Sequence, residues 1–381
     1  MKIRYGMVGG SLTGMIGDVH RKALNIDEMV ELVAGAFSPD QGRNKATGEA
    51  CKLDSDRVYD DYKTMAKTES SRADGIDFVV VVTPNDSHYG ICKAFLEAGI
   101  HVICDKPLCL EVWEAEELEK LSELKNLLFG LTYTYVGYTT VKIMREMVQK
   151  GVIGDIVSVN AEYVDECMMS LPGLDANDPA VLSDWRMDPK RAGVSSCVAD
   201  IGTHIEYTVH YITGLLIKRL VATANTYGHV LDLNANMIIE YENGVNGAYW
   251  CSNVAAGKLN GLLVRIYGTK GSLEWDQHYP DYIRYTPVGK PPQILSRGCG
   301  YLTEEAASNS RLHQGSPEGT FEAFANLYKN MVGSIIKLKN GETPTGNELD
   351  YPTVKDGLNG IKFVHAFAES AKNNSVWVNI N

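Results

Sequence analysis

Residues 2–14 read KIRYGMVGGSLTG, an apolar run that ends in a glycine-rich turn, and a helical pattern follows at 15–26. A strand, a glycine turn and a helix in this order begin a dinucleotide-binding βαβ unit. Gly9 and Gly14 fit the tight turn and the close helix packing, while Ser11 replaces the middle glycine, where the backbone approaches a pyrophosphate. The residues expected to face a dinucleotide there are Gly9, Ser11, Leu12, Thr13 and Gly14. The alternative is a glycine-rich turn that binds no ligand.

Strand-like and helical segments alternate along the first third of the chain. Apolar runs typical of strands occur at 2–8, 30–37, 78–83, 101–104 and 127–132, and helical patterns occur at 15–26, 86–98 and 111–124. Strands that are joined through helices pair in parallel by right-handed crossovers. The sequence therefore predicts an α/β fold that begins with a Rossmann domain, a doubly wound parallel sheet, over residues 1–132.

A different pattern begins near residue 133. Helices are expected at 139–150 and 200–212, a strand at 156–163, and further strands at 220–227, 235–241, 245–252, 261–267 and 272–275. Short connections such as Asn243-Gly244 force antiparallel pairing. Helical patterns at 317–337 and 353–372 close the chain. We expect residues 133–381 to form an α+β substrate-binding domain with a large open, mostly antiparallel sheet, and helix 353–372 to be able to pack back on the first domain.

Composition narrows the class of protein. The chain has 381 residues, of which 44% are hydrophobic and 22% charged, as in a globular protein with two domains. The net charge of −12 disfavours nucleic acid and anionic membranes as partners. The eight cysteines form no C-x-x-C pair, so the common zinc spacings are missing and no metal site is predicted. The N-terminal residues lack a signal-peptide pattern, and we expect a cytoplasmic protein.

The end of the second strand bears on the choice of nucleotide. It reads Ala36-Phe37-Ser38-Pro39-Asp40, so Phe37 stands where an acid that binds a ribose 2′-hydroxyl is usual. Asp40 could reach the ribose, or Ser38 and Arg43 could receive a 2′-phosphate. NAD and NADP therefore both remain open from these residues.

Two further segments follow strands at the carboxyl edge of the expected sheet, where ligands bind. The first is Thr83-Pro84-Asn85 with His88, for which we expect contact with cofactor or backbone and no catalytic role. The second is Asp105-Lys106-Pro107, where a lysine could hold a reacting hydroxyl and stabilise an oxyanion.

Asp200 and His204 lie four residues apart in a predicted helix with small and apolar flanks. On one helix face, a carboxylate one turn away can orient an imidazole and raise its basicity. A surface ion pair is the alternative, but a buried pair would be a candidate for general base catalysis.

On these motifs the chain resembles the Gfo/Idh/MocA family of glucose–fructose oxidoreductases and inositol dehydrogenases over essentially its whole length. The marks are the glycine turn, Thr83-Pro84-Asn85 with His88, Asp105-Lys106-Pro107 where the family usually has Glu-Lys-Pro, Trp185-Arg186, Asp200 with His204, Tyr241-Glu242-Asn243-Gly244, and Tyr267-Gly268-Thr269-Lys270-Gly271. The resemblance implies that Lys106, Asp200 and His204 are catalytic and that the open sheet is a homo-oligomer interface. The stretch Gly315-Ser316-Pro317-Glu318-Gly319 looks closest to a branch that acts on sugars, glycosides or anhydrosugars.

We therefore expect an NAD(P)-dependent oxidoreductase that transfers hydride to or from a secondary ring hydroxyl carbon of a sugar, glycoside, anhydrosugar or inositol, for example at C3 to form a keto-sugar. NAD(H) is favoured and NADP(H) is not excluded. His204, oriented by Asp200, would remove the hydroxyl proton, and Lys106 would stabilise the alkoxide. The cofactor-binding residues expected beyond the glycine turn are Ser38, Asp40, Arg43, Thr83, Pro84, Asn85, His88, Asp105, Lys106, Trp185 and Arg186. The substrate-binding residues expected are Lys106, Tyr133, Tyr135, Asp165, Arg186, Asp200, His204 and His313.

Two alternatives remain open at this point. One is a nucleotide-binding sensor that has lost the chemistry, although a sensor would not need Lys106, Asp200 and His204 together. The other is an oxidoreductase that keeps its nicotinamide bound and oxidises one sugar while it reduces the next.

Overall fold

The computed structural model describes residues 2–298, 300–301 and 303–380. The chain forms two compact units. The first unit contains Met1–Gly137 and Thr320–Leu358, and the second contains Tyr138–Gly319 and Asn359–Asn381. The sequence places residues 133–137 and 320–352 in the second domain, whereas their contacts group them with the first unit.

A five-stranded parallel sheet forms the centre of the first unit, in the order β2-β1-β3-β4-β5. Its strands are β1 (Ile3–Gly9), β2 (Val30–Ala36), β3 (Phe78–Val82), β4 (His101–Cys104) and β5 (Phe129–Leu131). The chain runs to one side from β1 to β2 and to the other side from β3 to β5. The carboxyl ends of β1 and β3 therefore border the point at which the strand order reverses, which is where nucleotides bind in open α/β sheets.

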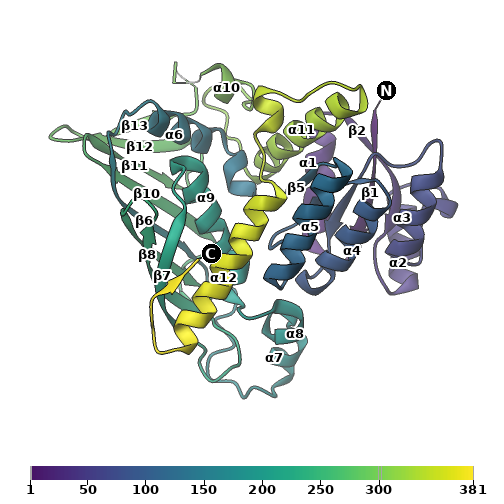
Figure 1. Ribbon diagram of the computed structural model, residues 1–381, viewed down its shortest axis with the longest axis horizontal. Helices are drawn as coiled ribbons and strands as arrows, with labels where there is room; N and C mark the ends of the chain where they lie inside the picture. Colours follow the sequence, from purple (N-terminus) through teal and green to yellow (C-terminus); the bar gives the residue numbers. More distant parts are fainter. Residues whose placement is uncertain (1, 299, 302, 381) are drawn as a thin grey trace. The chain divides into compact units, whose positions relative to one another are not determined.

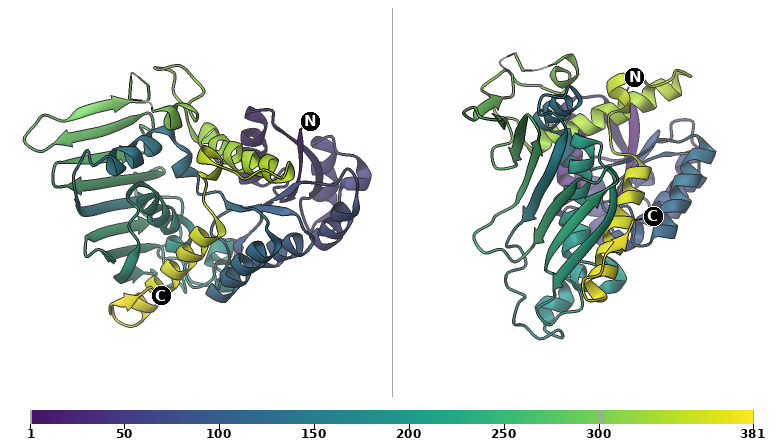
Figure 2. Two further views of the ribbon diagram at one scale, coloured as in Figure 1. Left: turned by 45° about the horizontal axis from the view of Figure 1, so that its top comes forward. Right: turned by 60° about the vertical axis from the view of Figure 1, so that its left-hand side comes forward.

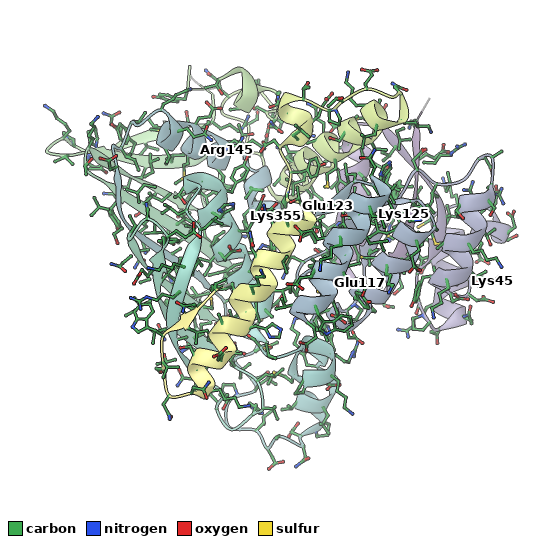
Figure 3. All side chains as sticks on the ribbon, in the orientation of Figure 1. Lys45, Glu117, Glu123, Lys125, Arg145 and Lys355 are labelled. Carbon is green, nitrogen blue, oxygen red and sulfur yellow. The ribbon has the colours of Figure 1, made fainter. Side chains whose placement is uncertain are left out.

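Helices cover this sheet, as Figure 1 shows. They are α1 (Met15–Ile26), α2 (Gln41–Ala50), α3 (Tyr62–Ser71), α4 (Asn85–Glu97) and α5 (Val112–Lys125), with α11 (Thr320–Lys339) added from the C-terminal part. From α5, Glu123 and Lys125 project into solvent (Figure 3). Helix α11 packs against α1 because both present apolar faces, and this contact brings residues 320–339 into the first unit.

The second unit is built on a nine-stranded sheet in the order β13-β12-β11-β10-β6-β9-β8-β7-β14. Its strands are β6 (Ile156–Val164), β7 (Ile217–Asn225), β8 (Asn234–Tyr241), β9 (Asn246–Ser252), β10 (Gly261–Gly268), β11 (Gly271–Asp276), β12 (Tyr282–Pro287), β13 (Gln293–Ser296) and β14 (Val378–Asn379). All neighbours pair antiparallel except β6 and β9, which are parallel. The predicted fold class, a Rossmann sheet followed by a mostly antiparallel sheet, is confirmed.

Helices α6 (Thr139–Gln149), α9 (Thr203–Thr213) and the later part of α12 (Val354–Lys372) pack on one face of the nine-stranded sheet (Figure 2). Short helices α7 (Pro179–Ser183), α8 (Pro189–Ala192) and α10 (Glu304–Ala307) lie in the connections. The core beneath α6 contains Trp275, which is fully buried and whose Nε1–H donates to Thr140 Oγ1 at 2.9 Å. In the described part of the chain, no helix combines the length and apolarity that a membrane crossing requires.

Candidate functional site

The turn after β1 contains two glycines with left-handed backbone. Gly9 has a φ of +83° and Gly10 a φ of +68°. A β-carbon on Gly9 would lie 2.6 Å from the Val82 carbonyl oxygen, and one on Gly10 would lie 3.0 Å from Gly17 Cα. Side chains are therefore excluded at both positions by conformation and by space. The backbone of the turn is left open at the reversal point of the sheet.

The close approach of helix to turn lies at Gly17 and not at Gly14. A β-carbon on Gly17 would come 2.3 Å from Gly10 Cα, whereas one on Gly14 would meet no atom closer than 3.4 Å. The prediction that Gly14 fills the packing role is therefore wrong. Gly14 is the N-cap of α1, and its N–H donates to the Ser11 carbonyl at 2.8 Å. The reason is that α1 begins only after Gly14, so the contact falls one turn later.

The start of α1 fits a bound diphosphate. Within the described residues no side chain caps the helix at Gly14, so N–H groups of its first turn are available to an anion. Leu12 and Thr13 are exposed and Ser11 is half-buried. The Leu12 N–H donates to Thr47 Oγ1 at 3.3 Å. The side-chain hydroxyls of Ser11 and Thr13 lie 3.1 Å apart at the surface. Their contacts with a nucleotide stay a prediction.

Phe37 has a packing role at the end of β2. Its side chain is buried, and its ring covers Gly35, where an added β-carbon would lie 2.1 Å from Phe37 Cζ. The Phe37 N–H donates to Asn44 Oδ1 at 2.8 Å, which ties the strand end to α2. The residue is therefore held in the interior and does not present a group to a ribose.

Ser38, Asp40 and Arg43 follow Phe37 at the surface. Asp40 is the N-cap of α2, and its Oδ1 accepts the Arg43 N–H at 2.8 Å. The Asp40 N–H in turn donates to Ser38 Oγ at 3.2 Å. Helix capping by itself accounts for an aspartate at this position. Contact of these three residues with the 2′-group of a nucleotide stays a prediction.

Thr83, Pro84 and Asn85 connect β3 to α4 at the same edge of the sheet. His88 is fully buried, with Nδ1 at 2.8 Å from the Pro107 carbonyl and Nε2 at 2.8 Å from the Thr83 carbonyl. His88 therefore links the segment after β3 to the segment after β4. This backbone contact is one of the two outcomes expected for a histidine without a catalytic role.

Asp105 anchors the segment that carries Lys106. Its Oδ1 accepts the Lys106 N–H at 3.0 Å and the Thr132 hydroxyl at 2.7 Å, and its Oδ2 lies 3.7 Å from His20 Nε2. Burial alone would raise the pKa of the Asp105 carboxyl, but His20, Lys106 and Thr132 together hold that pKa far below its usual range. An ionised carboxylate thus holds the backbone of Lys106 at the carboxyl end of β4.

Tyr133 and Tyr135 follow Thr132 in the first unit. Tyr135 lies in a 3₁₀ turn (Thr134–Gly137), and both tyrosine side chains are buried. They come after β5, the neighbour of β4 in the sheet, and thus at the edge at which Lys106 lies. Their predicted contact with substrate stays a prediction.

In the second unit, Asp200 lies in a π-helical turn (Val198–Gly202) directly before α9. The Thr203 N–H donates to the Val198 carbonyl five residues earlier, so this turn holds one residue more than an α-helical turn. The regular helix predicted for 200–212 is therefore wrong at its start, and the simple one-turn stacking of Asp200 on His204 does not apply. That Asp200 orients His204 stays a prediction.

Arg186 forms an ion pair with Asp200. Its Nε lies 3.2 Å from Asp200 Oδ2, and its NH1 lies 3.7 Å from Asp184 Oδ1. The guanidinium stacks on the neighbouring Trp185, 4.7 Å from the ring centre. Burial opposes the charge, but Asp200 and Asp184 outweigh it and raise the pKa of the Arg186 guanidinium. Trp185 and Arg186, predicted to bind cofactor, thus hold a fixed cation against Asp200.

Asp165 follows β6 and is buried close to this ion pair. Its Oδ1 accepts the Cys167 N–H at 3.0 Å and the Asn253 Nδ2–H at 3.3 Å. Burial, Asp165 and Asp200 raise the pKa of the Cys167 thiol to about 12 although Arg186 opposes them. A protonated thiol at neutral pH can donate a hydrogen bond but is a poor nucleophile.

His204 is buried on α9, and its ring centre lies 5.8 Å from that of Tyr163, on β6. Tyr163 precedes Asp165 by two residues, so the strand that carries Asp165 also contacts His204. The second unit therefore brings Asp165, Arg186, Asp200 and His204 to one region. Lys106 belongs to the first unit, and its action together with His204 stays a prediction.

A buried carboxylate supports the Asp200 turn from a distant loop. Asp232, between β7 and β8, accepts the Ser196 N–H at 2.9 Å and the Val198 N–H at 3.1 Å. Burial raises the pKa of the Asp232 carboxyl despite these bonds. Asp232 thus accepts N–H groups at the start of the π turn, where the Ser195 hydroxyl is a second acceptor for the Val198 N–H at 3.2 Å.

His313 lies on an exposed loop whose base is a buried ion cluster. Its Nδ1 lies 2.7 Å from Ser316 Oγ. At the base, Arg297 is 2.9 Å from Asp281 and 3.1 Å from Glu318, and it also donates to the Leu312 carbonyl. The substrate contact of His313 stays a prediction.

Sequence reasoning missed several residues that build these sites. They are Gly10, Gly17, His20, Thr132, Tyr163, Cys167, Asp232, Asn253, Arg297 and Tyr328. Gly10 follows Gly9 directly, so the pair of glycines could have indicated a second left-handed position in the turn. Asp232 and Arg297 act on backbone far away in the sequence, and no local pattern indicates such a contact.

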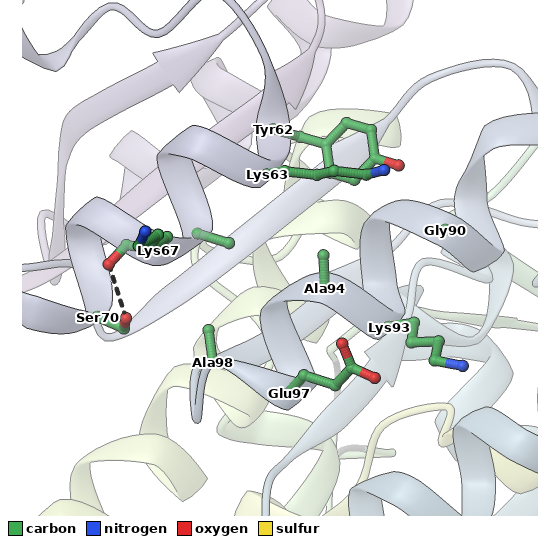
Figure 4. A pocket seen from close by; sticks show the side chains of 10 residues that line it. Tyr62, Lys63, Lys67, Ser70, Gly90, Lys93, Ala94, Glu97 and Ala98 are labelled. Carbon is green, nitrogen blue, oxygen red and sulfur yellow. Dashed lines mark hydrogen bonds between the residues drawn. The ribbon is translucent and has the colours of Figure 1, made fainter.

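A surface groove of about 570 Å³ lies between α3 and α4 (Figure 4). Its lining includes Lys63, Lys67 and Lys93, and none of its lining residues is a predicted site residue. Lys93 is paired with Glu117 at 2.6 Å. The groove is therefore separate from the carboxyl edge of the sheet.

Family models match both units. Residues 3–133 match the model described as the oxidoreductase family with an NAD-binding Rossmann fold, GFO_IDH_MocA. Residues 141–274 match the model of the GFO/IDH/MocA C-terminal domain. The matched ranges contain all the predicted site residues except Tyr135 and His313.

Full-length relatives are also found. The chain is 37% identical to the uncharacterised oxidoreductase YfiI of Bacillus subtilis, over 99% of this chain and 96% of that protein. It is similar to the crystal structure of an inositol dehydrogenase homologue from Azotobacter vinelandii with NAD⁺, at 36% identity and a TM-score of 0.94, over 100% of this chain and 97% of that chain. The same homologue with NADH and myo-inositol is 36% identical, with a TM-score of 0.93, over 100% and 98% of the two chains.

Proposed function

The chain belongs to the GFO/IDH/MocA family of NAD-binding oxidoreductases, and from this premise we propose that it oxidises a secondary ring hydroxyl of a cyclic polyol of the inositol class. The predicted family and the predicted preference for NAD(H) are confirmed by these matches, while NADP(H) stays open. The Azotobacter vinelandii homologue with myo-inositol supports the inositol class within the broader set of sugars, glycosides and anhydrosugars.

The observation that carries the proposal is the polar cluster of the second unit. A cyclic polyol presents several hydroxyls, and each needs a donor or an acceptor in the site. Asp165 and Asp200 offer carboxylate oxygens, Arg186 offers N–H groups, and the Cys167 thiol is exposed beside them. This mixture of fixed acceptors and donors suits a ring of vicinal hydroxyls better than an apolar alcohol.

Each of these residues would have a separate role in the reaction. The glycine turn and the start of α1 would hold the diphosphate of NAD, whose nicotinamide supplies the hydride acceptor when bound. Lys106, held through its backbone by Asp105, would donate a hydrogen bond to the reacting hydroxyl oxygen and stabilise it as negative charge develops. An imidazole nitrogen of His204 would take the hydroxyl proton. Arg186 would hold its positive charge against the Asp200 carboxylate.

Absorbance at 340 nm tests this proposal. Purified protein with NAD⁺ or NADP⁺ is given myo-inositol, scyllo-inositol, hexoses, anhydrosugars and aryl glycosides. We expect the fastest reduction with NAD⁺ and an inositol. Turnover restricted to another sugar class would contradict the substrate assignment. A protein that binds a nucleotide but reduces it with none of these compounds would support the sensor alternative, and a protein that binds neither nucleotide would contradict both enzyme alternatives. Reduced cofactor that stays with the protein through gel filtration would support the tethered one.

Variants test the assigned roles. Lys106→Ala and His204→Ala should each lower kcat by about 10²-fold or more, within the range for lost acid–base and oxyanion groups. Lys125→Ala and His101→Gln are the matched controls, because Lys125 is exposed at the end of α5 and His101 lies at the amino end of β4. Losses below about threefold at Lys106 and His204 would contradict the assignment.

We also propose that the uncovered face of the nine-stranded sheet joins copies of this chain. The face presents Ile238 and Tyr267, which are 53% and 43% exposed, and a groove of about 490 Å³ that Ile238 and Trp250 line. Exposed apolar residues in one sheet face are typical of a subunit interface. Ile238→Glu should shift the molecular mass measured by light scattering to that of a smaller species. An unchanged mass would contradict this interface, and the cytoplasmic location stays a prediction from the sequence.

A further inference from the structure

A buried chain of side chains in the first unit ends at the segment that carries Lys106. His20, on α1, is fully buried, with Nδ1 at 2.6 Å from the hydroxyl of Tyr328, on α11. Its Nε2 faces Asp105 Oδ2 at 3.7 Å. The ring of Phe324 packs on the imidazole, 4.8 Å between centres. His20 thus has one polar neighbour on each ring nitrogen.

The protons on this chain follow from the chemistry of its members. Asp105 is ionised, since its neighbours lower the pKa of its carboxyl, and it can only accept hydrogen bonds. If the Tyr328 hydroxyl donates to His20 Nδ1, the ring proton must be on Nε2, which points to Asp105. If the ring carries both protons, Nε2 is again protonated. If Tyr328 instead accepts from Nδ1–H of a neutral ring, the bare Nε2 faces the carboxylate with no proton between them, which is electrostatically unfavourable. We therefore infer that Nε2 carries a proton and points at Asp105 Oδ2 from 3.7 Å.

We propose that Tyr328 and His20 are positioning residues that act through Asp105 to hold Lys106 for reaction. This inference rests on the role of Lys106 in the proposed function. Asp105 Oδ1 accepts the Thr132 hydroxyl and the Lys106 N–H, while the His20 imidazole lies 3.7 Å from Oδ2, within ion-pair distance but too far for a hydrogen bond. Removal of His20 frees one side of the carboxylate, so the acceptor for the Lys106 backbone is no longer fixed.

The His20–Asp105 contact connects two elements that the proposed function uses. His20 stands on the helix that begins at the glycine turn, and Asp105 follows β4. The helix expected to hold the nucleotide and the lysine expected to hold the substrate oxygen are therefore tied by one imidazole. Small displacements at a reacting group can lower the rate by about 10²-fold.

Kinetics of conservative variants test the chain Tyr328–His20–Asp105, which we call the relay. Tyr328→Phe removes one hydroxyl and keeps the ring, and we expect kcat to fall about threefold to tenfold. His20→Leu should lower kcat by about tenfold to 10²-fold, with the Kd for NADH, measured by fluorescence, within about twofold of the parent. The double variant should be no slower than His20→Leu, because both changes break one chain. A kcat within about twofold of the parent for both single variants would overturn the relay.

Controls separate this inference from the proposed function. His101→Gln removes another histidine, whose Nδ1 accepts the Leu128 N–H at 2.9 Å at the opposite end of β4, and kcat should not change. If Lys106→Ala keeps full turnover, the proposed function is wrong. If Lys106→Ala is inactive but His20→Leu is not impaired, only the relay is wrong.

A measurement without substrate tests the relay directly. The chain has nine histidines, and ¹⁵N-histidine labelling with His20→Gln as the assignment variant isolates the His20 ring signals. We expect a protonated Nε2 from pH 6 to 9 and a shift of the Nδ1 signal in Tyr328→Phe. A His20 ring with a bare Nε2 would overturn the relay whatever the substrate is.

Discussion

Gly17 of α1 lies against Gly10 of the turn so closely that a β-carbon on Gly17 would be 2.3 Å from Gly10 Cα. Gly17→Ala should therefore push the helix away from the turn. We expect a loss of about 1–3 kcal/mol in the free energy of unfolding, as for other overpacked sites, together with weaker NADH binding. Urea unfolding and NADH fluorescence titration measure the two effects.

Gly42→Ala is the matched control for that substitution. Gly42 is exposed in α2, and its nearest neighbour to an added β-carbon, Asp40 Oδ1, is 3.4 Å away. Alanine is the better helix former, so we expect unchanged or slightly higher stability. Equal effects of the two substitutions would show that the Gly10–Gly17 contact is unimportant.

Arg186 should matter more for turnover than for stability. Its side chain is 38% exposed, so loss of the pair with Asp200 should cost at most about 1 kcal/mol of stability. We expect Arg186→Ala to lower kcat/KM for the polyol by about tenfold to 10²-fold, because Asp200 loses the cation beside it. Arg186→Lys keeps the positive charge but loses the planar guanidinium, so its kcat/KM should lie between those of the parent and of Arg186→Ala. A lower melting temperature with unchanged kinetics would contradict this role.

Arg297 should matter for stability. Its side chain is 3% exposed and lies between Asp281 and Glu318, so Arg297→Leu leaves two carboxylates without their common cation. Breaking a buried ion pair costs about 3–5 kcal/mol, which urea unfolding can measure. Arg72→Leu, which breaks a pair with the 56% exposed Asp74, should leave the free energy of unfolding almost unchanged, because solvent screens that pair. Similar losses for the two variants would contradict the buried character of the Arg297 cluster.

Asp232 should give the stability a distinct pH dependence. Burial raises the pKa of its carboxyl in the folded state, so the folded protein keeps this proton to a higher pH than the unfolded chain does. The contribution of Asp232 is therefore greatest below the ordinary aspartate pKa and is lost as the pH rises through the raised value. We expect the melting temperature of the parent, minus that of Asp232→Asn, to decrease with rising pH in this range. A difference that increases with pH would contradict the raised pKa.

Local patterns predicted most elements of the first unit because strands and helices there alternate with clear periods. Helix 15–26 and strand 101–104 were predicted with the bounds that the structure has. Helices α2 and α3 were not predicted. Their sequences are polar around most of their circumference, so they lack the apolar stripe from which a helix is recognised.

The sequence predicted only part of the candidate site. Lys106, Asp165, Arg186, Asp200 and His204 were chosen for their chemistry and their flanks, and the structure brings the last four of them to one region. Their partners could not be predicted in the same way. Arg186 forms an ion pair with Asp200, which lies in a π turn that has no sequence signature. Asp232, between two strands, accepts a backbone N–H of the same turn.

The sequence by itself determined the parallel sheet of the first unit, the open sheet of the second, and the chemical groups from which a site can be made. These depend on hydrophobic periodicity and residue type, which are local properties. Tertiary structure alone decided that Gly17 and not Gly14 meets the turn, that Arg186 pairs with Asp200, and that His20 joins Tyr328 to Asp105. Those contacts depend on how separate elements pack, and residues that are far apart in the sequence have no periodicity in common.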